Sequence, residues 1–182
     1  MTETTPGTPR ESGPLTRVQK TLFIQDNTYA LVNPAAPPER FTDPVETGVV
    51  AITHRGGIAA SVTCGTHIGD IRITTETWPT TPLIADEPWE DIAEISLPWP
   101  GGRMVLWSSD DDEPDEITLY EHAEPGSYRI RAQVRGRDLG EDRTEDDTLE
   151  EHLLQIWPAK PDQPNNLKTT DRTGAYWRSL RG

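Results

Sequence analysis

The 182-residue sequence has little of what a disulfide framework, a membrane span or a secreted protein would need. It contains one cysteine, Cys64, so no disulfide can form within the chain, which fits a reducing compartment. No run approaches the roughly 20 apolar residues that span a bilayer. The first residues also lack the basic start and apolar stretch of a signal peptide. We therefore expect a soluble, cytoplasmic protein.

Positive charge is scarce. The chain has 17 Lys and Arg against 31 Asp and Glu, and its formal net charge is -14. Binding to nucleic acid depends on clustered Lys and Arg, so the composition argues against a general nucleic-acid binder. The excess negative charge leaves two interpretations open, because it can serve solubility alone or attract a basic protein partner.

Apolar residues are concentrated between residue 15 and about residue 159, enough for one folded core. Residues 1–14 consist mainly of Thr, Pro, Gly and Glu. They are expected to form a disordered tail, because they bury too little apolar surface to offset the entropy of ordering. Residues 160–182 are expected to form a second tail. The sequence therefore predicts a single domain over 15–159.

Short alternating apolar segments within this domain are separated by Gly, Pro, Asn and Asp, which is typical of β structure. The predicted strands are 17–25, 28–33, 47–54, 58–66, 69–76, 90–97, 103–109, 116–122, 127–137 and 151–157. Residues 144–156 also fit a helix, but Ile156-Trp157 before Pro158 favours a strand. The pattern predicts an all-β fold, an antiparallel β-sandwich, and leaves closure into a barrel open.

Turn residues predict two hairpins. Gly56-Gly57 can adopt the positive φ of a tight turn, so 47–66 is expected to fold with Val49 opposite Cys64. Side chains alternate along a strand, and this register places Cys64 in the core. A second hairpin is expected to join 90–97 to 103–109 through the rigid turn 98–102.

No catalytic motif is present: the sequence lacks a G-x-S-x-G turn and a glycine-rich phosphate loop. Cys64 and His67 lack the further ligands of a structural zinc site. His54 and His67 are predicted on the order of 26 Å apart at about 3.3 Å per residue, too far to share a metal. His122 and His152 lie on different predicted strands. With carboxylates, they leave open a metal-dependent enzyme or small-ligand binder on a β-sandwich or cupin-like barrel. Otherwise we expect no cofactor, no metal and no catalytic residue.

Three features remain as candidate binding sites: an acidic run, a row of arginines on one face of strand 127–137, and an aromatic pair near the C-terminus. Their residues are Asp110, Asp111, Asp112, Glu113, Asp115 and Glu116; Arg129, Arg131 and Arg135; and Tyr176 and Trp177. A second acidic stretch runs from Asp138 to Glu151.

Each feature has two interpretations. The acidic stretches can occupy a basic nuclease groove in place of phosphates, or they can be ordinary solvated loops. The arginine row can grip carboxylates or phosphates, or acids on neighbouring strands can pair with it. The aromatic pair can dock on a partner or fold back on the chain's own acidic loops. A structural component of a larger assembly would use the arginine row or the aromatic pair.

Two segments resemble a known group of proteins. Residues 125–137, PGSYRIRAQVRGR, and 151–159, EHLLQIWPA, are similar to a set of small actinobacterial β-sandwich proteins. These proteins are similar in turn to the competence protein J family, inhibitors of a DNA-entry nuclease. The resemblance covers the C-terminal third, rests on residues that determine the fold, and transfers no functional residue. It implies a sandwich and an inhibitory or immunity-type binding role.

Together these observations predict a non-catalytic, acidic protein-binding module. Its expected partner is a basic protein such as a nuclease. Direct binding of nucleic acid or of a membrane is not expected.

Overall fold

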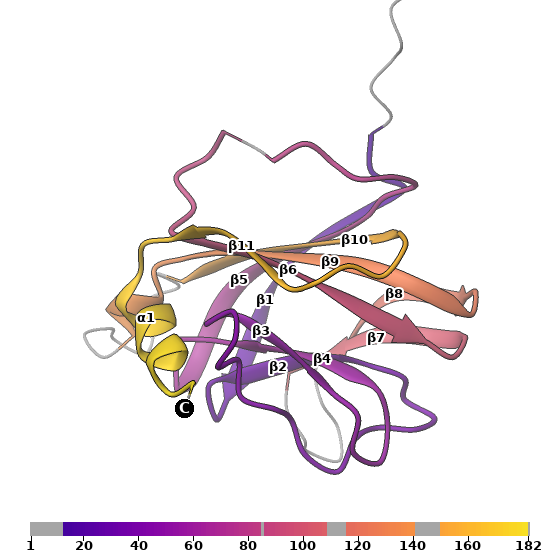
Figure 1. Cartoon of the computed structure of the whole chain (residues 1–182), viewed down its shortest axis with the longest axis horizontal. Coiled ribbons are helices and arrows are strands. Elements are labelled where there is room, and N and C mark those ends of the chain that lie inside the picture. Colours follow the sequence, from indigo (N-terminus) through magenta and orange to yellow (C-terminus); the bar gives the residue numbers. More distant parts are fainter. Residues whose placement is uncertain (1–12, 85, 109–115, 141–149, 182) are drawn as a thin grey trace, which may run out of the picture.

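The computed structural model describes residues 13–84, 86–108, 116–140 and 150–181 (Figure 1). Strands dominate these residues, with one short 3-10 helix and one α-helix. The elements are β1 Thr16–Gln25, β2 Thr28–Val32, β3 Val50–Thr53, β4 Ala59–Thr63, β5 Ile68–Thr77, β6 Asp91–Trp99, β7 Gly102–Trp107, β8 Glu116–Ala123, β9 Gly126–Arg135, η1 Arg137–Leu139, β10 Glu151–Pro158, β11 Asn165–Thr169 and α1 Arg172–Ser179. Neither helix in the described part of the chain has the length and apolar character to cross a membrane.

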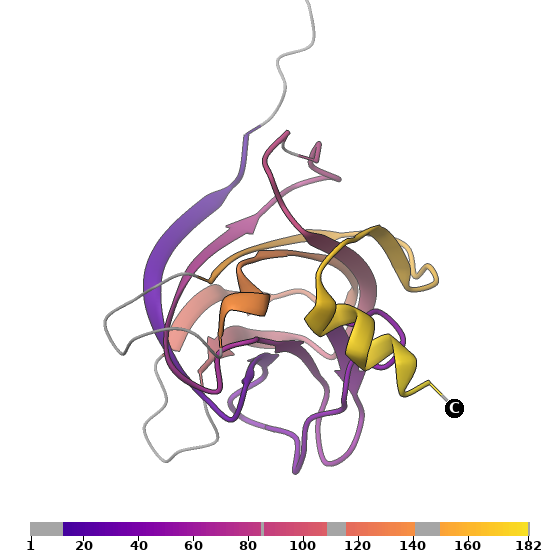
Figure 2. The same ribbon diagram turned by 90° about the vertical axis from the view of Figure 1, so that its left-hand side faces the viewer.

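The strands form one continuous sheet that curls into a half-barrel (Figure 2). The order is β11-β6-β9-β10-β5-β1-β2-β4-β3, with β7 paired to β2 and β8 paired to β7. The prediction of a mainly β fold is confirmed. The antiparallel sandwich is wrong in detail, because the sheet is mixed: β10 runs parallel to β5. The two halves of the sheet also stay connected, since β1 turns directly into β2 where Gln25 pairs with Thr28.

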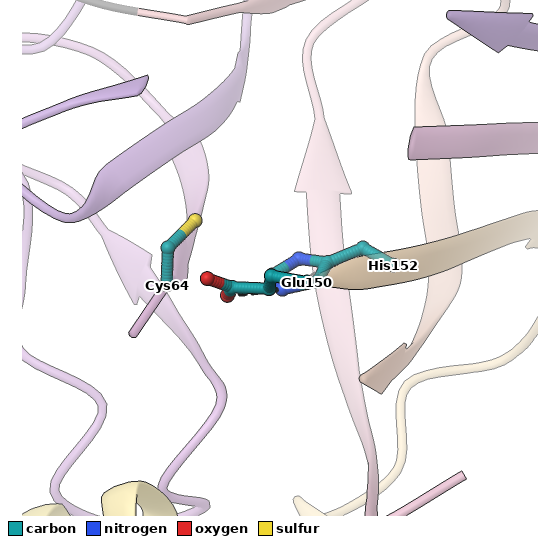
Figure 3. Close-up of side chains that lie close together, drawn as sticks. All are labelled: Cys64, Glu150 and His152. Atoms are coloured by element: carbon teal, nitrogen blue, oxygen red, sulfur yellow. Dashed lines mark hydrogen bonds and ion pairs between the residues drawn. The ribbon is translucent and has the colours of Figure 1, made fainter. Parts of the chain in front are cut away.

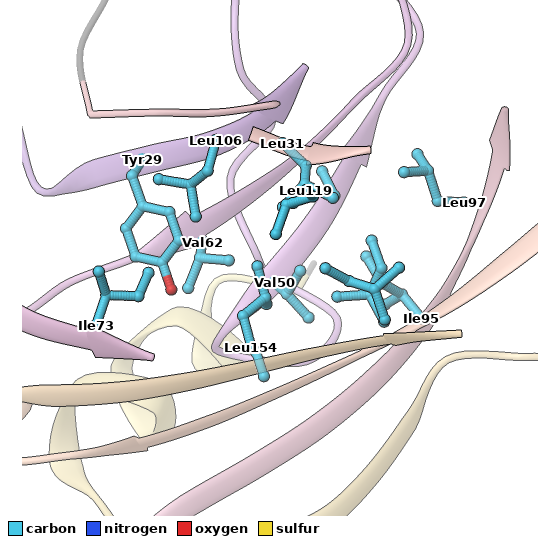
Figure 4. Close-up of a cluster of buried hydrophobic side chains, with 14 of the residues drawn as sticks. Tyr29, Leu31, Val50, Val62, Ile73, Ile95, Leu97, Leu106, Leu119 and Leu154 are labelled. Carbon is cyan, nitrogen blue, oxygen red and sulfur yellow. The ribbon is translucent and has the colours of Figure 1, made fainter. Parts of the chain in front are cut away.

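The core lies inside this curl (Figure 4). Inward-facing side chains from both halves meet there, including Tyr29, Leu31, Ile73, Leu106 and Leu154. Each is at most 1% exposed. Burying a side chain of this size stabilises the fold by about 1.5–3 kcal/mol, so this cluster is a main source of stability.

The hairpin between β3 and β4 forms, but its predicted register is wrong by one residue. Val62 pairs with Val50, whereas the predicted pairing of Val49 with Cys64 would place Ala51 opposite Val62. The turn is also wider than two residues, because β3 ends at Thr53 and β4 begins at Ala59, and it packs against an earlier segment. A Cβ on Gly57 would lie 2.1 Å from the backbone oxygen of Ala36, and such close packing suits glycine. Cys64 is buried, as predicted.

The second predicted hairpin does not form as a hydrogen-bonded pair. Strand β6 pairs with β9 and β11, whereas β7 pairs with β2 and β8. The turn at Gly101, which has φ of 100°, carries the chain from one half of the curled sheet to the other. Proline and glycine thus mark a sharp turn correctly without specifying which strands pair.

Most other strand predictions are confirmed, and the ambiguous segment before Pro158 is the strand β10. The predicted C-terminal tail is wrong. Residues 165–169 form β11 on the edge of β6, and 172–179 form α1. The side chain of Asp171 caps this helix by accepting from Gly174 N at 2.6 Å. Residues 1–12 of the predicted N-terminal tail lie outside the described residues.

Candidate functional site

The turn between β1 and β2 packs against the connection between β4 and β5 at one end of the fold. Asn27, in the left-handed region at φ 59°, is the contact. Its backbone oxygen accepts from Cys64 N at 2.7 Å, and its side-chain nitrogen donates to Gly65 O at 3.2 Å. The Oδ1 atom of Asn27 lies 2.8 Å from Nδ1 of His67. These three contacts hold the turn between β1 and β2 against the connection between β4 and β5.

A buried polar cluster lies directly behind this turn and contains Cys64, Glu150 and His152 (Figure 3). Tyr29 completes the cluster through its contact with His152. The Nε2 atom of His152 lies 2.7 Å from Oε1 of Glu150, and Nδ1 lies 2.9 Å from the Tyr29 hydroxyl. The carboxylate of Glu150 also accepts from the backbone N–H of Gly65 at 3.0 Å. Its other oxygen accepts from the N–H and hydroxyl of Thr66 at 2.8 and 2.7 Å.

Burial and hydrogen bonding act in opposite directions in this cluster. Burial raises the pKa of Cys64, and the negative charge of Glu150 raises it further. Burial also raises the pKa of Tyr29. For Glu150, burial favours the neutral acid, but hydrogen bonds from His152 and Thr66 outweigh burial and leave its pKa below the ordinary value. The cluster thus contains a charged carboxylate beside a protonated thiol. It lacks the lowered thiol pKa of an activated nucleophile.

A second buried cluster holds α1 on the sheet. Arg137, 1% exposed, binds Asp171 through Nε and one terminal nitrogen, at 2.6 and 2.8 Å. It also donates to the backbone oxygen of Gly48 at 2.8 Å. Asp91 lies between Arg137 at 3.4 Å and Arg178 of α1 at 2.8 Å. Four charged side chains therefore connect the helix to η1, β6 and the loop before β3.

A cavity of about 470 Å³ lies between the two clusters. Its lining combines charged, polar and aromatic side chains with one glycine. The lining residues are Asn27, Cys64, Gly65, Arg137, Asp138, Arg172, Thr173, Tyr176 and Trp177. Cys64 is the member of the first cluster that reaches this cavity.

The first predicted acidic run lies mostly outside the described residues. Asp110, Asp111, Asp112, Glu113 and Asp115 belong to that part, and their role stays a prediction. The sixth residue begins β8, where Glu116 pairs with Arg103 at 2.6 Å and accepts from Trp107 Nε1 at 3.1 Å. The Trp107 and Arg103 hydrogen bonds hold the pKa of Glu116 below its ordinary value, although partial burial opposes them.

The arginine row is paired within the sheet. Arg129 and Arg131 are 5% and 3% exposed, and both bind Glu94 on β6, at 3.3 and 2.7 Å. Arg135 binds Glu151 on β10 at 2.5 Å and stacks over Trp89, 4.9 Å from the ring centre. These contacts favour the cross-strand interpretation, so we leave the row out of the proposed binding surface.

The aromatic pair lies on α1. Tyr176 is 59% exposed, and its ring contacts Trp177 edge-on at 5.5 Å between centroids. Both side chains line the cavity. Asp138 accepts from the backbone N–H groups of Arg172 and Thr173, at 2.8 and 2.9 Å. One acid of the second acidic stretch thus holds the start of the helix that carries the pair.

The four histidines do not gather. His54 and His67 lie at opposite ends of β4, as predicted. His122 is exposed on β8, whereas His152 is buried. Among the described residues, the group with ligand atoms close enough for a metal contains His152 but not His122. The predicted combination of His122 with His152 therefore receives no support.

Sequence reasoning missed Glu150, Tyr29 and Asp171 as site residues. Glu150 is one of eight acids between 138 and 151, and nothing in that charged stretch distinguished this buried acid from the others. One available signal was its position two residues before His152, because alternate residues of an extended chain share a face. No local signal indicated that Asp171 would meet Arg137, since 34 positions separate them.

Comparison with known proteins gives one informative structural likeness. No protein-family model and no curated protein matches the chain. The crystal structure of ComJ, inhibitor of the DNA degrading activity of NucA, from Bacillus subtilis, aligns with a TM-score of 0.55 and 10% identity. The alignment covers 78% of this chain and 96% of ComJ. The chain shares the fold of ComJ. A structure described as crocagin biosynthetic gene J aligns with a TM-score of 0.48 and 13% identity, over 80% of this chain and 98% of that one.

Proposed function

We propose that this protein is a non-catalytic module that binds a basic protein, and that the partner is a nuclease which the module inhibits. The observation that carries the proposal is the net charge of -14, together with the positions of the described residues that flank the two acidic stretches. These flanking residues lie toward the end of the sheet at which β2 begins. A negatively charged surface of this kind speeds association with a basic partner and disfavours acidic ones.

The anchors of the first acidic stretch are the last residue of β7 and the first of β8. Trp107 pairs with Ala30 on β2 and with Glu116 on β8. The chain therefore leaves and re-enters the sheet beside the start of β2, close to Asn27.

The anchors of the second stretch lie at the connection between β4 and β5. A Cβ on Gly140 would lie 2.5 Å from the backbone oxygen of Gly65, so these two backbones are in close contact. Glu150, where the described chain resumes, accepts from Gly65 N. Gly65 in turn accepts from Asn27. Asn27 thus contacts Gly65 beside the second pair of anchors, and Trp107 of the first pair is paired with Ala30, three residues after Asn27. The proposed binding surface is the end of the sheet around Asn27.

The fold of ComJ supports the partner class. ComJ inhibits the DNA-degrading activity of NucA, and this chain has the same fold at 10% identity. A nuclease must present a positively charged groove to the phosphates of DNA, and a cluster of carboxylates can compete for such a groove. The cytoplasmic location expected from the sequence stays a prediction.

The test is inhibition of DNA cleavage by a purified nuclease of the NucA type. Inhibition by the wild type should weaken as NaCl rises, because salt screens attraction between exposed charges. The triple variant Asp110→Lys, Asp111→Lys and Asp112→Lys should inhibit at least about tenfold more weakly, since the charges at the proposed surface are reversed.

A matched control reverses charge at a distance from this surface. Glu121 and Glu124 are exposed near the far end of β8 and the turn after it. Glu121→Lys with Glu124→Lys should leave inhibition nearly unchanged. Equal inhibition by the wild type and the triple variant, or no inhibition of such a nuclease at any salt concentration, contradicts the proposal.

A further inference from the structure

We propose that Cys64, Glu150 and His152 form a binding site for one divalent metal ion of the zinc class. The site is independent of any protein partner and goes beyond the proposed inhibitory role. The three ligand atoms, one from each residue, all lie within 4.8 Å of one another. Each residue is at most 2% exposed. In Figure 3 the carboxylate of Glu150 points toward Cys64, with the His152 ring on the side away from Cys64.

The distances between the three ligand atoms require only small side-chain movements to reach tetrahedral coordination. Zinc binds sulfur at about 2.3 Å and nitrogen or oxygen at about 2.0–2.1 Å, so ligand atoms of one site lie roughly 3.3–3.6 Å apart. The Nε2 atom of His152 and Oε1 of Glu150 are 2.7 Å apart and must separate slightly. The thiol must approach by no more than about 1.5 Å on the same bond lengths. Three protein ligands leave a fourth position for water.

Charge balance favours a divalent ion at this position. A buried charge is costly unless it is paired. A Cys64 thiolate and the Glu150 carboxylate carry two negative charges, which one divalent cation neutralises. A cysteine binds a metal ion as the thiolate, so the ion would replace the thiol proton and binding should release it.

The surrounding hydrogen bonds already hold two of the ligands in place. Tyr29 contacts Nδ1 of His152 and so orients the ring with Nε2 toward the site. Because a tyrosine hydroxyl can donate or accept, this contact persists when Nε2 changes from donor to ligand. The second oxygen of Glu150 is held by Thr66. The carboxylate keeps that support while its first oxygen binds metal.

The donor set selects the metal. One sulfur, one imidazole nitrogen and one carboxylate oxygen suit zinc or cobalt, whereas calcium and magnesium prefer all-oxygen sites. Cys64 also lines the cavity of about 470 Å³ beside α1, so an ion in that cavity needs only a local opening to reach the ligand atoms.

The experiment is titration of the metal-free, full-length protein with Co²⁺, followed by displacement with Zn²⁺. Cobalt bound to a thiolate gives an ultraviolet charge-transfer band and visible bands typical of tetrahedral coordination. Cys64 is the only cysteine, so the ultraviolet band reports this site alone. We expect saturation at one equivalent of Co²⁺ and loss of the bands when Zn²⁺ is added. Tyr29→Phe should weaken Co²⁺ binding about 10–100-fold, because it removes the hydroxyl that orients His152.

Two variants test the ligands, and one serves as control. Cys64→Ser should abolish the charge-transfer band, and His152→Gln should abolish the tetrahedral visible bands. His67→Gln, at an exposed histidine close to Cys64 in sequence, should bind as the wild type does. Thermal unfolding of each metal-free variant shows whether it folds, and Cys64→Ala replaces Cys64→Ser if the latter does not. Absence of the bands in folded wild type at millimolar Co²⁺, or unchanged bands in folded His152→Gln, overturns the proposal. Neither result depends on nuclease inhibition.

Discussion

Arg137 and Asp171 form a two-point ion pair in which both side chains are completely buried. The pair joins η1, after β9, to the residue that caps α1. Arg137 also donates to backbone oxygens of Gly48 and Thr63, at 2.8 and 3.3 Å. One guanidinium thus supports three separate parts of the chain. The C-terminal helix therefore belongs to the folded domain.

Arg137→Met should strongly destabilise the protein. The variant leaves the buried carboxylates of Asp171 and Asp91 without their shared cation, and breaking a buried pair in this way costs about 3–5 kcal/mol. Urea denaturation measures the free energy of unfolding. The matched control is Arg181→Met, because Arg181 is exposed and its contact with Glu46 is 3.6 Å long. The control should change stability by less than about 1 kcal/mol. Equal effects of the two variants would contradict the role given to Arg137.

Gly174→Ala should destabilise the protein, although alanine normally favours a helix over glycine. An added Cβ at Gly174 would lie 2.2 Å from a carboxylate oxygen of Asp91 and 2.8 Å from a terminal nitrogen of Arg137. Overpacking of this kind costs about 1–3 kcal/mol. The neighbouring Ala175 is exposed, so Ala175→Gly should lose only about 0.5–1 kcal/mol of helix propensity. Stabilisation by Gly174→Ala in thermal unfolding would show that the helix is not docked as described.

Asp138 should contribute stability that depends on pH. Burial raises its pKa, but hydrogen bonds from the backbone of Arg172 and Thr173 outweigh burial and place the folded pKa below the ordinary 3.8. The unfolded chain then binds the proton more readily, so the contribution is complete above about pH 5 and is lost as pH falls through the folded pKa. Asp138→Asn should therefore be less stable than wild type by about 1 kcal/mol at pH 7, with a smaller difference at pH 3.

Urea denaturation across this pH range measures that difference. Asp86→Asn, at an exposed position in the loop before β6, provides the control. The free energy of unfolding of this control should equal that of the wild type at every pH. A difference between Asp138→Asn and wild type that grows as the solution becomes more acidic would contradict the assignment.

The sequence predicted the strands well because each strand is a local pattern. Alternation between Tyr128 and Val134 defined β9, and Ile156-Trp157 before Pro158 separated a strand from a helix in β10. Pairing was less predictable. Strand β10 lies between β9 and β5, and its parallel pairing with β5 joins residues about 80 positions apart. Such pairing depends on the whole curled sheet, and no turn residue encodes it.

The candidate site was less predictable than the strands for the same reason. Charge patterning identified the arginine row correctly as one face of β9 but could not show that Glu94 and Glu151 would pair with it. Cys64 was correctly placed in the core. Its neighbours Glu150 and His152 come from a segment more than 80 positions later, so their convergence follows from the pairing of β5 with β10. Long-range contacts of this kind leave no short motif.

Cys64 should be inert in the native protein. It is 2% exposed, and burial followed by the charge of Glu150 raises its pKa, so few thiolates are available to react. In chelator-treated protein, alkylation of Cys64 should be on the order of a hundredfold slower than in urea, because reaction requires local opening.

The control for this measurement is an exposed thiol in the same fold. Phe23 is 47% exposed on β1, so Phe23→Cys in a Cys64→Ala background places a thiol at the surface. That thiol should react in native protein at nearly the rate seen in urea, because neither burial nor a neighbouring cluster protects it. If Cys64 in the native protein reacted as fast as this surface thiol, the buried cluster of Tyr29, Cys64, Glu150 and His152 would be wrong, and the proposed metal site would lose its basis.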